Sequence, residues 1–238
     1  MLKFIKLLFA GPMEDPHRYV RPALENQWRN VLSIWHNDAA ATFGIERLFR
    51  LFLAISAYLF PGIYIRHWAG RHGLLSRRLA LEVFVTGKMA LPLVILWSHV
   101  EHSLFSQIAV VYFGVETLLY VLGLLFLSDV YKAPISNKRS YLLLVLNYLE
   151  ICLDFAVLYR GLGVISNLNS SFDAVYFSFI TAFTVGYGDM SPAAFGGKLL
   201  VISESLCSLV LITLALAKVV SGFEENHARK GPGNHKDG

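Results

Sequence analysis

The sequence predicts an all-α membrane protein with about five transmembrane helices and one shorter helix that enters the membrane and turns back. Composition is the first reason, because 55% of the 238 residues are hydrophobic and only 16% are charged. A soluble domain of this length does not carry so apolar a surface. The second reason is a set of five apolar runs, each close to the roughly 20 residues that a helix needs to cross the hydrocarbon core.

The five apolar runs are separated by shorter polar stretches. None alternates apolar and polar residues at period two, as the strands of an outer-membrane barrel must, so helices are the expected spans. The runs cover residues 48–65, 79–97, 104–127, 141–159 and 199–220.

The N-terminal leader, residues 1–44, contains apolar side chains at spacings of three and four, preceded by Pro22. This pattern predicts an amphipathic helix lying at the membrane interface. The apolar stretch near residues 7–10 is too short for a cleaved signal peptide, so we expect the leader to stay attached. The stripe consists of Leu24, Trp28, Val31, Leu32 and Trp35.

Basic residues set the expected orientation, because lysine and arginine favour cytoplasmic loops. They crowd the first and third connections and are absent from residues 98–104, which places the connection 160–197 outside. Five spans then put a basic leader outside as well. The alternative is that run 48–65, which contains Arg50 and the Pro61-Gly62 break, does not fully cross, leaving four spans and a cytoplasmic N-terminus. We favour five spans and leave both open.

Residues 171–183 begin with a helix-capping type of residue and continue for about three helical turns. They are too few to cross the membrane and are followed by Gly-Tyr-Gly. Nonhelical backbone at membrane depth is tolerated only where it lines a wet cavity. A re-entrant pore helix and loop are therefore expected.

The loop 184–189 reads Thr-Val-Gly-Tyr-Gly-Asp. Gly186 and Gly188 lack a side chain and can adopt the dihedral angles that turn successive carbonyls toward one axis, while Val185 and Tyr187 point outward and pack. The Thr184 hydroxyl adds an oxygen at the inner mouth, toward which the negative end of the pore-helix dipole points. Such stacked oxygens suit a dehydrated potassium ion. One loop supplies a quarter of each ring, which predicts a homotetramer.

These six residues match the signature of potassium channels, and residues 141–223 resemble the two-helix pore domain of bacterial potassium channels. The resemblance implies a potassium-selective channel that conducts passively, in an integral multi-pass protein of the bacterial inner (plasma) membrane. It also implies that Asp189 braces the outer mouth and that Tyr176 and Phe177 form an aromatic cuff. The implied K+ ligands are Thr184, Val185, Gly186 and Tyr187, with Gly188 completing the filter.

The inner helix departs from the family at one position, because Ser208 stands where many relatives carry a hinge glycine. Helical spacing predicts a cavity-lining face made of Leu209, Ile212, Thr213 and Leu216. In the pore helix, Ile180 replaces the carboxylate that some relatives pair with the equivalent of Asp189. We therefore expect neither a glycine-hinge gate nor that carboxylate coupling.

Voltage sensing needs several arginines in the span before the outer helix, since each charge crossing the field yields about 2.3 kcal/mol per 100 mV. Run 104–127 has Glu116 as its only ionisable residue, and Arg47 and Arg50 lie two spans earlier. Little voltage dependence is expected. Residues 224–238 are expected to form a disordered cytoplasmic tail, too short for a regulatory domain.

Residues 45–140 are predicted to form three membrane helices of unknown role. Lys88 and Glu116 stand at similar depths on neighbouring antiparallel helices, so an ion pair between them is one of two open predictions, the other being that they do not meet. His99 and His102, three apart in an outer loop, are compatible with a divalent ion or a pH sensor but fit a solvated loop better.

The chain contains no catalytic motif and no basic face interleaved with aromatic residues, so neither an enzyme nor a nucleic-acid partner is expected. No cofactor or small-molecule ligand is indicated, apart from K+ as the transported ion. The lipid bilayer and identical copies are the expected partners. Two alternatives remain, a potassium-transporter subunit, although such proteins string four degenerate pore loops along one chain, and a non-conducting accessory membrane subunit.

Overall fold

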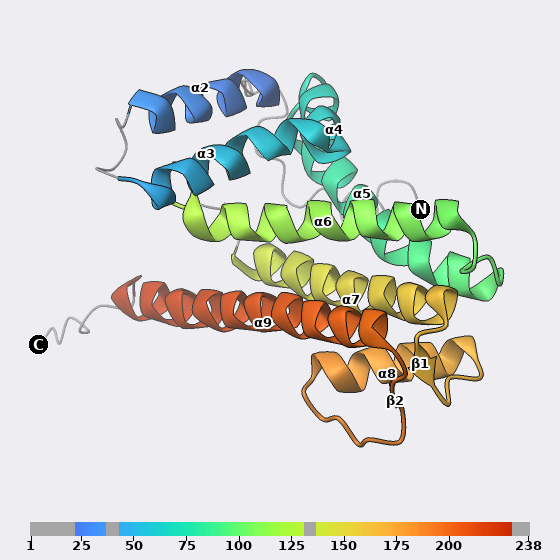
Figure 1. The fold of residues 1–238 in the computed structure, drawn as a ribbon. Coiled ribbons are helices and arrows are strands. Elements are labelled where there is room, and N and C mark those ends of the chain that lie inside the picture. The colour runs from blue at the N-terminus through green and yellow to red at the C-terminus, as the bar shows by residue number, and fades with distance from the viewer. Residues whose placement is uncertain (1–21, 37–42, 131–136, 230–238) are drawn as a thin grey trace, which may run out of the picture. The chain divides into compact units, whose positions relative to one another are not determined.

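The computed structural model describes residues 22–36, 43–130 and 137–229, and it is almost entirely helical (Figure 1). The chain divides into two compact units, the first within residues 1–94 and 108–133 and the second within residues 95–107 and 134–238. The first unit contains α2 (Ala23–His36), α3 (Ile45–Ser56), the short 3-10 helix η1 (Ala57–Leu59), α4 (Pro61–Gly70) and most of α5 (Leu74–Trp97) and α6 (Leu104–Phe126). The second contains the α5–α6 turn, α7 (Asn137–Leu162), β1 (Ile165–Ser166), α8 (Ser171–Ala182), β2 (Ser191–Pro192) and α9 (Phe195–Arg229).

Four helices are long and apolar enough to cross a membrane, which confirms the predicted all-α membrane class. The segments are Leu75–Trp97, Leu104–Phe126, Ser140–Leu162 and Phe195–Ala217. The first predicted run, 48–65, is instead a bent pair, Ile45–Leu59 and Pro61–Gly70, whose axes differ by 67°. Pro61 lacks a backbone N–H and therefore begins α4 rather than continuing the preceding helix. The described residues thus offer four spans, or five if the bent pair crosses as one.

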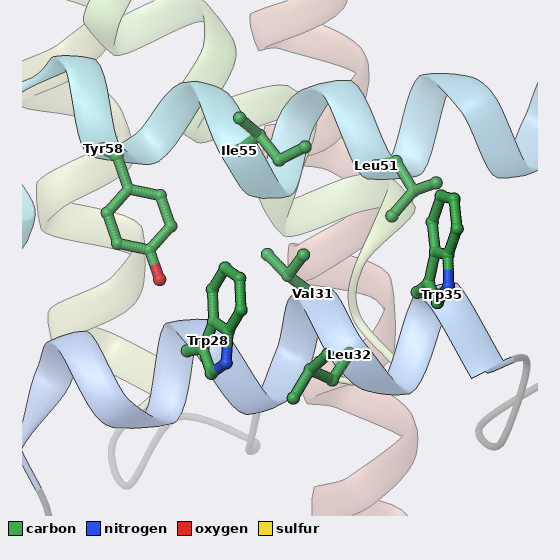
Figure 2. A pocket seen from close by; sticks show the side chains of 7 residues that line it. All are labelled: Trp28, Val31, Leu32, Trp35, Leu51, Ile55 and Tyr58. Carbon is green, nitrogen blue, oxygen red and sulfur yellow. The ribbon is translucent and has the colours of Figure 1, made fainter.

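The amphipathic helix predicted for the leader is present as α2, but its buried face differs from the predicted stripe. Val31 and Ile34 pack against α3, and the Gln27 side-chain amide donates a hydrogen bond of 2.7 Å to the Ala54 carbonyl. Trp28 and Trp35 remain exposed and line an apolar groove between α2 and α3 (Figure 2). Hydrophobic spacing identified the helix, whereas α3 determined which side it buries.

The pairing predicted between Lys88 and Glu116 is confirmed. The Lys88 Nζ lies 3.9 Å from Glu116 Oε2 and donates to Thr117 Oγ1 at 2.5 Å, and the two charged side chains are 6% and 8% exposed. Glu116 Oε1 also accepts a hydrogen bond of 3.2 Å from the Gly62 backbone N–H in the first turn of α4. One carboxylate therefore neutralises a buried lysine and satisfies an N–H group of the helix that follows the bend.

Arg50 is a second charge buried in this unit. Its guanidinium donates to both carboxylate oxygens of Asp129, at 2.8 and 2.6 Å, and lies 3.8 Å from Glu46. Both contacts come from Nη2, and these charge-assisted hydrogen bonds partly compensate the arginine for its lost hydration. Arg50 is thus fixed by its partners on and beyond its own helix.

The C-terminal boundary differs from the prediction. Helix α9 continues to Arg229, so residue 224 is too early a start for the predicted tail. A long helix extends readily once formed, because each further residue adds one hydrogen bond without a new nucleation cost. Residues 230–238 lie outside the described part of the chain.

Replacing Lys88 by methionine should destabilise the protein by about 3–5 kcal/mol, because Glu116 then keeps a buried charge without its cation. The double variant Lys88→Met/Glu116→Gln should recover much of this loss, since the amide oxygen still accepts from Gly62. Thermal unfolding in detergent micelles measures both. The control is Arg29→Met at the exposed Arg29–Glu25 pair, expected to cost only about 0.3–0.5 kcal/mol. A double variant no more stable than Lys88→Met contradicts the explanation.

Candidate functional site

The start of α8 is fixed by a reciprocal capping box. The Ser170 Oγ accepts from the Asp173 N–H at 3.0 Å, and Asp173 Oδ2 accepts from the backbone N–H groups of Ser170 at 2.8 Å and Asn169 at 3.0 Å. The hydrogen bond from the Ser170 N–H contributes most, and together these hydrogen bonds hold the pKa of the Asp173 carboxyl below its usual value. The cap is Ser170, one residue before the expected Ser171. The short helix thus begins where its sequence satisfies its own N-terminus.

Helix α8 packs against both α7 and α9 through a small hydrophobic cluster. Phe177 is buried, and its ring meets the Tyr159 ring edge-on with centroids 5.0 Å apart. Ile180 and Ile165 complete the buried part of the cluster, against which Tyr176 packs. Of the two predicted cuff residues, Phe177 thus lies in the core and Tyr176 at its margin.

The loop after α8 is attached to the C-terminus of that helix. The Ile180 carbonyl accepts hydrogen bonds from the N–H groups of Val185 at 2.8 Å and Gly186 at 3.2 Å. The last carbonyls of a helix carry the negative end of its dipole. The loop therefore begins beside a partial negative charge, as expected from the sequence.

The sign of φ alternates along the loop. Thr184, Gly186 and Gly188 have positive φ values of 57°, 54° and 81°, whereas Val185 and Tyr187 do not have a positive φ. Such alternation can turn successive N–H groups to one side of the loop and carbonyls to the other. The unusual dihedral angles expected for the two glycines are confirmed. The positive φ of Thr184 was not predicted, because a β-branched residue rarely adopts it.

The side chains of the loop have little contact within one chain. Val185 is 50% exposed and Tyr187 is 72% exposed, so the outward packing predicted for them is not provided by this chain. An added Cβ at Gly186 or Gly188 meets no atom within 4 Å. These positions need glycine for its backbone conformation rather than for lack of space.

The segment after the loop is held by a small antiparallel sheet. β1 pairs with β2 in the register Ile165 to Pro192 and Ser166 to Ser191. The Asn167 side-chain amide donates to the Asp189 carbonyl at 3.2 Å. The pKa of the Tyr176 hydroxyl is raised, mainly because that group loses contact with water and secondly because it is hydrogen-bonded to the Asp189 side chain. Asp189 and Tyr176 are thus neighbours. The sheet holds the C-terminal end of the loop, and it was not predicted from the sequence.

Helix α9 buries one side and leaves the other uncovered. Glu204, Ser208, Leu211 and Leu214 are buried at helical spacing, while Leu209, Thr213 and Leu216 are exposed and Ile212 is partly buried. The set predicted to line a cavity therefore lies mainly on a face that a single chain leaves free. Ser208, at the position of the hinge glycine, belongs to the packed side.

The histidine pair lies in the turn between α5 and α6 rather than on a helix. His99 has a φ of 54°, and His102 Nδ1 lies 3.1 Å from the Gly161 carbonyl oxygen. In the same turn, buried Glu101 lies 3.5 Å from Arg160. Across the described ranges, no group of three or more His, Cys, Asp or Glu residues could hold a metal ion.

Part of the second unit is similar in sequence to known proteins. Residues 145–225 match the profile of the ion channel family. A stretch of 80 residues is 36% identical to a hyperpolarization-activated voltage-gated potassium channel of Methanocaldococcus jannaschii, covering 34% of this chain and 37% of that protein. A stretch of 60 residues is 38% identical to a voltage-gated potassium channel of Aeropyrum pernix, covering 25% of this chain and 20% of that protein. No solved structure gives a significant match.

These matches confirm the resemblance to the potassium channel pore-domain family over that segment. The candidate spans and these matches identify an integral, multi-pass membrane protein in which residues 145–225 are similar to the ion channel family. The matched relatives are channels and not enzymes, as expected. Because the aligned stretches cover only 37% and 20% of the two relatives, the activity of the whole chain does not follow from them.

Proposed function

We propose that this chain is one subunit of a homotetrameric, potassium-selective channel that conducts K+ passively. The observation that carries the proposal is the alternating backbone of residues 184–188, exposed at the C-terminal end of a short capped helix. Residues 184–188 belong to no helix or strand, and we infer that their alternating φ signs turn a run of carbonyls to one side. The potassium channels matched by the sequence support the choice of ion.

The proposed ion sites use backbone oxygens that replace the hydration shell of K+. Thr184 contributes both its carbonyl and its hydroxyl, and Gly188 lets the chain leave the axis. Asp189, beside Tyr176, steadies the outer mouth, and Phe177 anchors the pore helix in the core. The carbonyl ligands are those of Thr184, Val185, Gly186 and Tyr187, and the cavity below is lined by Leu209, Ile212, Thr213 and Leu216.

Four copies are required because one loop surrounds only a quarter of the axis. Closed cyclic symmetry places the same residue of each copy on one ring. The exposed side chains of Val185 and Tyr187 then gain packing partners from neighbouring copies. The bacterial inner (plasma) membrane remains our proposal for the location of this assembly.

Two alternatives were considered. A potassium-transporter subunit normally carries four pore loops in one chain, whereas this sequence has one. A non-conducting accessory subunit has no need for a threonine held at positive φ, a conformation that costs about 1–3 kcal/mol. That strain favours the conducting pore.

Gly186→Ala should reduce the ratio of potassium to sodium flux to near one in liposomes holding the purified protein. A methyl group at positive φ costs roughly 1–2 kcal/mol, which shifts the Val185 and Gly186 carbonyls from the axis. Gly163→Ala is the matched control, because Gly163 has a φ of 62° and open space around it but lies in the turn after α7. Equal sodium and potassium flux through the unaltered protein contradicts the proposal.

We also propose that the open probability depends only weakly on voltage. α6 contains no lysine or arginine, and Arg50 is held by Asp129 and Glu46. Both matched relatives are named as voltage-gated channels, but that property belongs to those proteins. Single-channel recording across a voltage series should show a shallow curve, and a curve equivalent to several elementary charges contradicts this expectation.

A further inference from the structure

A carboxyl group is buried where the three helices of the pore domain meet. Glu204 on α9 is 0% exposed. The Tyr159 hydroxyl, from α7, donates to Glu204 Oε2 at 2.6 Å, and the Ser178 hydroxyl, from α8, is hydrogen-bonded to Oε1. One side chain of the inner helix thus contacts the outer helix and the pore helix through separate oxygens.

This carboxyl group has no cationic partner among the described residues, and both of its contacts are neutral hydroxyl groups. Within the same chain, the buried charges of Arg50 and Lys88 each have an oppositely charged neighbour. An ionised carboxylate in an apolar interior is costly without such a neighbour. The surroundings of Glu204 therefore suit a neutral acid.

Counting hydrogen atoms leads to the same conclusion. The Ser178 Oγ lies within hydrogen-bonding distance of Glu204 Oε1 and of the Cys152 carbonyl oxygen, the latter at 2.6 Å. A hydroxyl has one hydrogen and cannot donate to both. If Glu204 carries a proton on Oε1, it donates to Ser178, which donates to Cys152, while Tyr159 donates to Oε2. Every contact then has its hydrogen, whereas the ionised form lacks one.

The network continues to the proposed filter. Ser178 is two residues before Ile180, whose carbonyl holds the N–H groups of Val185 and Gly186. A displacement of Glu204 with the inner helix would act on Ser178 of the pore helix, two residues from the point where the loop is attached.

We propose that Glu204, as a neutral carboxylic acid, is a positioning residue that fastens the inner helix to the pore helix and thereby maintains the geometry of the filter. The selectivity part of this inference rests on the proposed function. Its protonation part does not.

The test compares Glu204→Gln with Glu204→Leu in liposome flux. Glutamine reproduces the neutral acid, because its amide N–H donates to Ser178 and its oxygen accepts from Tyr159, so the potassium-to-sodium ratio should be retained. Leucine removes both contacts and should lower the ratio by roughly tenfold. Ser205→Ala is the matched control, since that hydroxyl bonds only to the Val201 carbonyl of its own helix. If Glu204→Leu does not assemble, Tyr159→Phe and Ser178→Ala, which each remove one contact, should both lower the ratio.

An infrared difference spectrum between the wild type and Glu204→Gln at neutral pH tests the protonation state directly. The proposal predicts the carbonyl stretch of a protonated carboxylic acid in the wild type only. A carboxylate band in its place overturns the neutral form, whatever the flux.

A selective wild type with an equally selective, assembled Glu204→Leu variant overturns the positioning role alone. A non-selective wild type instead overturns the proposed function and the selectivity role together, while the spectrum still decides the protonation state.

Discussion

A loop whose backbone carbonyls stay free to bind an ion cannot be held by regular helix or sheet hydrogen bonds. It must be held by the residues on either side of it, and this constraint shapes the second unit, called the pore unit below. Residues 184–188 alternate in the sign of φ and belong to no helix or strand. The loop is therefore fixed at its ends, by the Ile180 carbonyl on one side and by the β1–β2 pairing beside Asp189 on the other. The capping box and the contacts of α8 with α7 and α9 in turn fix the helix that holds the loop.

Buried ionisable groups are accommodated in two ways, because Glu101 beside Arg160 in the second unit is a charge pair like those of the first unit, whereas Glu204 is not. In the first unit, Lys88 with Glu116 and Arg50 with Asp129 bury opposite charges together. In the pore unit, Glu204 is surrounded by hydroxyl groups and fits a neutral acid. Charge pairs tie specific helices together through strong, directional contacts, whereas a neutral network adds no net charge close to a proposed cation pathway.

The sequence predicted those features that depend on local composition or on short, specific spacing. Apolar length identified the spans, and the Lys88–Glu116 pair followed from helical rise. The glycines of the loop identified two of its three positive φ values, but a threonine at positive φ has no signal in its residue type. Two-residue strands are too short for a periodic pattern, so β1 and β2 were missed. The buried face of α2 depends on α3, which the spacing within α2 does not encode, and Val185 and Tyr187 stay exposed in a single chain, so their predicted packing is left to the proposed neighbouring copies.

The proposed function requires that the carbonyls of residues 184–187 bind K+ along an axis shared by four copies. The most direct measurement is a crystal structure of the assembled protein with Tl+ in place of K+. Tl+ is a heavier substitute for K+, and its anomalous scattering shows where the ions bind. Our account predicts a row of anomalous peaks on a fourfold axis, each ringed by carbonyl oxygens of Thr184, Val185, Gly186 or Tyr187. An assembly whose loops enclose no anomalous density, or whose copies do not surround a common axis, would contradict it.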